Sequence, residues 1–118
     1  MSDYRLTLFE QAPRVPFKLD GRKLFSSADF EMVHLTLQPG EGLAPHAQPI
    51  DVVFFVVQGA GTLTVGDENL EIPENTTIHV KSGILRAWTN TGKLPLRILV
   101  NKLIYTTGSS GMMIQAMI

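Results

Sequence analysis

The chain has 118 residues, a length that favours a single domain able to bury one hydrophobic core. Its net charge of −1 and its charged fraction of 18% provide no basic surface for a nucleic acid or an anionic membrane. Because cysteine is absent, disulfides, thiolate nucleophiles and cysteine-ligated metal sites are all excluded.

The first 29 residues have the composition of an extended arm. They contain Pro13 and Pro16 and a polar turn at 20–23, which together predict one or two short strands at most. No apolar stretch approaches the roughly 18 residues of a membrane helix, and the N-terminus lacks an apolar signal-peptide region. We therefore expect a cytoplasmic protein with no membrane partner.

From residue 30 onward, glycine and proline turns separate short runs rich in Val, Ile, Leu, Phe and Thr. This rhythm is typical of an all-β sandwich or barrel. The run 52–57 is apolar throughout, which predicts burial on both faces, one lining a barrel and the other covered by a second sheet or subunit. Seven strands are predicted, over residues 30–37, 52–57, 62–65, 70–72, 76–80, 85–89 and 96–105.

The C-terminal segment is a Gly-Ser linker followed by an apolar stretch interrupted only by Gln115. Such a tail favours packing on the core or on a partner subunit, with a lid over a pocket as the alternative. We expect one domain over 1–118, with an arm at 1–29, a barrel core at 30–107 and the linker and tail at 108–118. Low charge, the doubly apolar strand and the tail predict a homodimer.

Two motifs occupy the middle of the chain. The first consists of Gly40, five residues, His46, one residue, Gln48, three residues, Val52, six residues and Gly59. The second consists of Asn75, five residues, Lys81, one residue, Gly83, two residues, Arg86, three residues and Asn90.

This spacing resembles that of the cupin family, whose motifs are G-x5-H-x-H-x3,4-E-x6-G and G-x5-P-x-G-x2-H-x3-N. The resemblance covers about residues 30 to 104. It implies a double-stranded β-helix barrel of the cupin or jelly-roll type. In metal-binding cupins, the two histidines and the glutamate of the first motif and the histidine of the second hold a metal ion inside this barrel.

Of these four ligand positions, only that of His46 keeps its histidine. Gln48 offers a weak amide ligand, Val52 has no lone pair, and Arg86 is a permanent cation that only donates hydrogen bonds. We therefore expect a degenerate metal site and no cofactor. The alternative is a divalent metal ion held by His46, Gln48 and, through a β-bulge, Asp51.

If Arg86 points inward, as the family histidine does, its charge needs a partner. Asp51 or Glu41 could supply a carboxylate, and so could a bound molecule carrying a carboxylate or phosphate. The competing interpretation places Arg86 at the barrel rim in a salt bridge. The candidate ligand-binding residues are His46, Gln48, Val52, Phe54, Arg86 and Trp88.

The other two histidines, His34 and His79, lie in predicted strands. A site made from all three histidines would require them to face one cavity, but no motif spacing supports it. Solvent-facing or hydrogen-bonded strand histidines are the favoured interpretation.

The leading hypothesis is a metal-free cupin that binds a small molecule, with an anion as one option, inside its barrel. The alternative is a cupin enzyme. It would be either a metal-dependent dioxygenase or isomerase with atypical ligands, or a metal-free isomerase or lyase with His46 as the base. A third hypothesis is a structural domain whose barrel is filled by side chains and has no cavity.

Overall fold

The computed structural model describes residues 3–16 and 18–104. A 3-10 turn, η1 (Phe9–Gln11), precedes the strands, and no helix in the described ranges is long and apolar enough to cross a membrane. The strands are β1 (Asp20–Ser26), β2 (Phe30–Leu37), β3 (Asp51–Gln58), β4 (Gly61–Val65), β5 (Glu68–Ile72), β6 (Thr77–Val80), β7 (Arg86–Thr89) and β8 (Leu96–Leu103).

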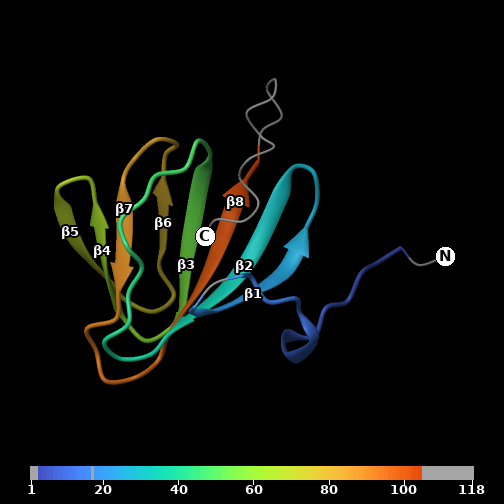
Figure 1. Ribbon diagram of the computed structural model, residues 1–118, viewed down its shortest axis with the longest axis horizontal. Coiled ribbons are helices and arrows are strands. Elements are labelled where there is room, and N and C mark those ends of the chain that lie inside the picture. The colour runs from blue at the N-terminus through green and yellow to red at the C-terminus, as the bar shows by residue number, and fades with distance from the viewer. Residues whose placement is uncertain (1–2, 17, 105–118) are drawn as a thin grey trace.

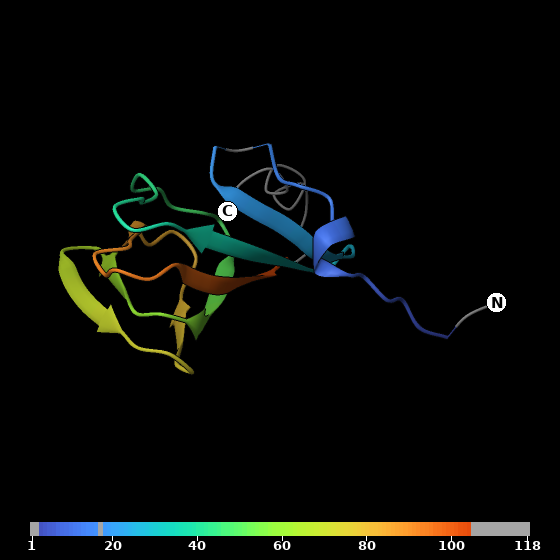
Figure 2. The same ribbon diagram turned by 90° about the horizontal axis from the view of Figure 1, so that it is seen from below.

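The seven predicted strands are confirmed to within two residues at their ends, and β1 lies inside the predicted arm. The predicted linker and tail at 108–118 lie outside the described residues. The strands form two antiparallel sheets, one with the order β1-β2-β8-β3-β6 and the other with the order β5-β4-β7. The two sheets face each other to make a barrel (Figures 1 and 2). The expected all-β class is therefore confirmed.

The core lies between the two sheets and follows from strict alternation along β3 and β8. Every second residue is buried along all of β8 and along β3 as far as Val56, and the residues between them are half-buried. Fully burying one large aliphatic or aromatic side chain stabilises the fold by about 1.5–3 kcal/mol. The inward residues include Val33, Leu35, Leu37, Val52, Phe54, Val56, Leu63, Trp88, Leu96, Ile98 and Val100.

The prediction that the run 52–57 is buried on both faces is wrong for the single chain. Val52, Phe54 and Val56 are buried inside the barrel, but Val53 and Phe55 are only half-buried on the outer face. The reason is that the three-stranded sheet packs against the inner face of the larger sheet (Figure 2).

Positive backbone φ angles explain the turn positions of the two motifs. Gly40, Gly59 and Gly83 have φ angles of 88°, 83° and 81°. Asn75, at the glycine position that opens the second motif, has a φ of 59°. Asparagine tolerates this left-handed region better than other side chains, so the turn survives the replacement of glycine.

Gly61, at the start of β4, allows Trp88 to lie flat against the backbone. A Cβ atom at this position would lie 2.9 Å from two carbons of the Trp88 ring and 2.5 Å from Leu96 Cδ2. We predict that Gly61→Ala lowers the free energy of unfolding by about 1–3 kcal/mol because it overpacks this contact. Urea denaturation followed by the fluorescence of Trp88, the only tryptophan, measures the change.

The matched control is Gly92→Ala, since the nearest atom to its Cβ would be at 3.4 Å, an ordinary contact. This variant is expected to change the unfolding free energy by about 0.5 kcal/mol or less. Equal losses in the two variants would contradict the assigned role of Gly61.

Candidate functional site

The two motifs are brought together by backbone pairing between β7 and the loop that joins β2 to β3 (Figure 1). The amide of His46 donates to the carbonyl of Arg86, and the amide of Arg86 donates to the carbonyl of His46, both at 3.0 Å. The amide of Leu43 also donates to the carbonyl of Trp88 at 2.9 Å. This loop therefore continues the three-stranded sheet beside β7.

Arg86 and Trp88 alternate with Ala87 along β7, so both side chains point into the barrel, and each is only 1% exposed. The Trp88 ring packs edge-on against Phe54, with ring centroids 5.5 Å apart. The Arg86 guanidinium lies over the same Phe54 ring, 5.7 Å from its centroid. The prediction that Arg86 and Trp88 share an inward face is confirmed, and the rim position for Arg86 is wrong.

The barrel interior contains polar atoms that lack hydrogen-bond partners. All three guanidinium nitrogens of Arg86, both amide atoms of Gln48 and the indole Nε1 of Trp88 are buried and unpaired. Buried polar groups in proteins are nearly always hydrogen-bonded, and each one left unpaired costs about 1–3 kcal/mol, or more when it is charged. Three of the six candidate ligand-binding residues thus carry buried, unpaired polar atoms, and most of these atoms are hydrogen-bond donors.

A second charged group lies inside the barrel, on β2 and β8. Lys102 Nζ donates to Glu31 Oε1 at 3.1 Å, and both side chains are 1% exposed. Lys23 Nζ lies 3.3 Å from the other carboxylate oxygen of Glu31. Burial lowers the pKa of Lys102, Glu31 opposes this effect, and the positive charge of Arg86 lowers the pKa further. Two lysines therefore share the Glu31 carboxylate, and the interior carries an excess of positive charge.

Neither carboxylate expected to neutralise Arg86 does so. Asp51 points to the outer face of β3, where its Oδ2 lies 2.8 Å from His79 Nε2. That hydrogen bond is the main cause of the lowered pKa of Asp51. Glu41 Oε1 instead accepts from the amide of Gln38 at 2.7 Å. Burial, with no compensating anion, lowers the pKa of Arg86, although a guanidinium still keeps its proton near neutral pH.

The three histidines do not converge. His34 is buried outside the barrel interior, where it accepts a hydrogen bond from Arg97 at 3.1 Å and contacts Phe9, and burial is the main cause of its lowered pKa. His79 pairs with Asp51, and His46 lies partly exposed beside Arg86. In the described part of the chain, no three His, Cys, Asp or Glu side chains gather in a group that could hold a metal ion.

The space beside Arg86 is narrow. It has no room for a water-sized molecule and is lined by Leu43, His46, Phe54, Arg86, Ala87 and Trp88. Val52 is fully buried on the same face of β3 as Phe54, whereas Gln48 and Val52 do not line this hollow. The interior is therefore closed in this conformation.

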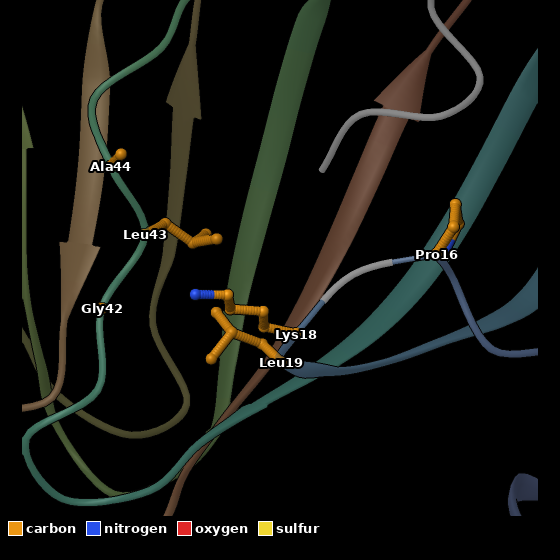
Figure 3. A pocket seen from close by; sticks show the side chains of 6 residues that line it. All are labelled: Pro16, Lys18, Leu19, Gly42, Leu43 and Ala44. Carbon is orange, nitrogen blue, oxygen red and sulfur yellow. The ribbon is translucent and has the colours of Figure 1, made fainter.

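A larger groove lies outside the barrel, between the loop that precedes β3 and the segment that precedes β1 (Figure 3). Its volume is about 410 Å³, and its lining residues are Pro16, Lys18, Leu19, Gly42, Leu43 and Ala44. No sequence motif indicated this groove, because its two walls lie far apart along the chain. The pairing of Glu31 with Lys102 was also missed, although both residues occupy inward positions of alternating strands.

Comparison with known proteins identifies the family. A family model described as the cupin domain matches residues 33–101, more than half of the chain. The chain belongs to the cupin family. A search of curated proteins finds no match to this cupin.

Solved structures share the fold of this cupin at low sequence identity. A protein with a double-stranded β-helix domain from Klebsiella pneumoniae has a TM-score of 0.75 and 16% identity, covering 90% of this chain and 95% of the other. An RmlC-like cupin from Methanocaldococcus jannaschii has a TM-score of 0.75 and 19% identity, covering 87% and 93%. A predicted oxalate decarboxylase from Thermotoga maritima has a TM-score of 0.68 and 18% identity, covering 72% and 79%. The expected double-stranded β-helix barrel is thus confirmed.

Glu31 holds the charge of Lys102 inside the barrel, so its removal leaves a buried cation without a partner. We predict that Glu31→Gln lowers the free energy of unfolding by about 3–5 kcal/mol. Glu71→Gln is the control, since Glu71 is exposed on β5 and accepts a hydrogen bond from Thr62 at 2.8 Å. The control is expected to lose about 0.5 kcal/mol or less. Similar losses in both variants, measured by urea denaturation, would contradict this assignment.

Proposed function

We propose that this cupin is a metal-free binding protein for a small anion, most specifically a carboxylate, held inside the barrel by Arg86. The single observation that carries the proposal is a guanidinium that is 1% exposed and whose three nitrogens lack partners. A charge buried in this way is costly unless an anion accompanies it. A bound carboxylate removes that cost and accepts two parallel hydrogen bonds from the planar guanidinium.

The neighbours of Arg86 support an anion over a cation or a neutral molecule. Trp88, which lines the same hollow, adds an N–H donor that also lacks a partner. The Glu31 carboxylate is occupied by Lys23 and Lys102, so the interior has a positive excess that attracts negative charge. A metal ion placed among these groups would meet repulsion from Arg86 and few good ligands.

The small size of the site limits its affinity. Acetate has four non-hydrogen atoms, and small ligands gain at most about 1.5 kcal/mol per such atom. Acetate therefore binds no more tightly than on the order of 40 µM. Because the hollow must also open to admit it, we expect a dissociation constant in the millimolar range.

Replacing Arg86 by methionine separates binding from folding. We predict that Arg86→Met raises the free energy of unfolding by about 1 kcal/mol or more in the absence of a carboxylate, since it removes an unpaired buried charge. The same change is expected to abolish the response of Trp88 fluorescence to sodium acetate, with sodium chloride at matched ionic strength as the control. Loss of stability in the variant, or an unchanged acetate response, would contradict the proposal.

An enzyme remains the alternative because His46 lies beside Arg86 in the sheet. An anion held by Arg86 would place its reacting carbon within reach of a histidine base, which an isomerase or lyase requires. A stoichiometric transition metal in gently purified protein, lost in His46→Ala, would instead favour a metal-dependent dioxygenase or isomerase with atypical ligands.

We further propose that the protein is a homodimer in which residues 3–8 contact the second copy. Tyr4, Leu6 and Leu8 are 78%, 77% and 51% exposed, and they alternate along a segment that runs away from the barrel (Figure 1). The half-buried outer side chains of β3, including Val53 and Phe55, offer an apolar surface for such a contact.

Sedimentation at micromolar concentration is expected to show a species of twice the 13.0 kDa chain mass. We predict that Leu6→Asp shifts this species toward the monomer because a charge replaces an apolar contact. Thr7→Asp, on the neighbouring residue of the same segment, is the control and leaves the dimer intact. A wild-type protein of 13.0 kDa would refute the dimer.

A further inference from the structure

The narrow hollow beside Arg86 and the larger outer groove share one wall, the side chain of Leu43. The inner hollow lies against Leu43 on one side, and the groove of about 410 Å³ lies against it on the other. Figure 3 shows Leu43 facing Lys18 and Leu19 across this groove. Leu43 is therefore the residue that borders both spaces.

The backbone at Leu43 is held in place, and its side chain borders the outer groove. Its amide donates to the carbonyl of Trp88 at 2.9 Å, and Gly42 forms a β-bridge with Thr89. The side chain itself is 9% exposed and borders the open groove. A change of rotamer at Leu43 would therefore join the groove to the inner hollow without breaking the sheet, and such changes are fast.

The chemistry of the two spaces differs. The inner hollow offers N–H donors from Arg86 and Trp88. The outer groove is mainly apolar, with Pro16, Leu19 and Leu43 among its lining residues and Lys18 as its charged residue. A volume of about 410 Å³ falls within the range of small-molecule sites. An anionic group fits the inner space, and a hydrocarbon body fits the outer one.

We propose that the ligand is a monocarboxylate with an apolar body, bound with its carboxylate on Arg86 and its body extending past Leu43 into the outer groove. This inference rests on the proposed function and adds the ligand class and the entry route. Leu43 acts as the gate between the two spaces. Lys18, exposed at the groove, attracts the carboxylate during entry.

The test uses Trp88, the only tryptophan, as an internal reporter of the inner hollow. The probes are acetate, butyrate, hexanoate, adipate and hexanol, titrated at constant ionic strength. Each buried CH₂ group is expected to raise affinity by up to about fourfold. We expect hexanoate to bind at least tenfold more tightly than acetate, and hexanol to bind more weakly than hexanoate.

Variants test the roles of Arg86 and of the outer groove in ligand binding separately. Arg86→Met and Arg86→Gln are expected to abolish hexanoate binding. Ala44→Phe fills the groove from an exposed position and is expected to remove the affinity advantage of hexanoate over acetate. Ala28→Phe, in the exposed turn between β1 and β2, is the matched control and keeps the advantage.

Stopped-flow measurements test the gate. Leu43→Ala is expected to speed hexanoate association at least several-fold, because the blocking side chain is removed. Leu94→Ala is the control, since Leu94 is 68% exposed and lies outside both spaces. Equal association rates for Leu43→Ala and the wild-type protein would overturn the role of Leu43 as gate.

The outcomes separate this inference from the proposed function. Equal affinities for acetate and hexanoate, both lost in Arg86→Met, would overturn the inference and leave the proposed function in place. Tighter binding of adipate than of hexanoate would overturn it as well, since a second carboxylate would then pair with Lys18. If none of the carboxylates binds, both the inference and the proposed function fail.

Discussion

The backbone pairing between His46 and Arg86 fixes the interior on which the proposed chemistry depends. Two hydrogen bonds of 3.0 Å align the loop before β3 with β7. Strand alternation then turns Arg86 and Trp88 inward and Ala87 outward. These backbone hydrogen bonds anchor Arg86, whose side chain is only 1% exposed. The second motif thus places a cation of the protein itself inside the barrel.

The interior charges form a consistent pattern around this frame. Glu31 is the carboxylate of the buried ion pair. Lys102 contacts one of its oxygens, and Lys23 contacts the other. Asp51 and Glu41 are engaged elsewhere, at the outer face of β3 and in the turn after β2. A small anion that enters this barrel therefore meets donors without internal competition, while a cation meets repulsion.

The sequence allowed the fold to be predicted, and the buried position of Arg86 and Trp88 with it, for a physical reason. Strand alternation and turn positions with positive φ, such as Gly59 and Asn75, are local properties that a single sequence displays. The spacing of the second motif places Arg86 at the position of the family histidine that points into the barrel. The closed state of the hollow, the partners of Glu31 and the groove beside Leu43 depend on packing between distant segments. No local pattern contains that information.

The position of β8 sets the order in which this barrel can form. It is the last strand of the described chain, yet it lies between β2 and β3 in the larger sheet. Its ion pair joins Glu31 and Lys102, 71 positions apart. Until β8 has been synthesised, the facing edges of β2 and β3 stay unpaired and can form hydrogen bonds with other nascent chains. Barrel closure therefore waits for β8, and its non-local contacts place refolding in the slower range for small domains.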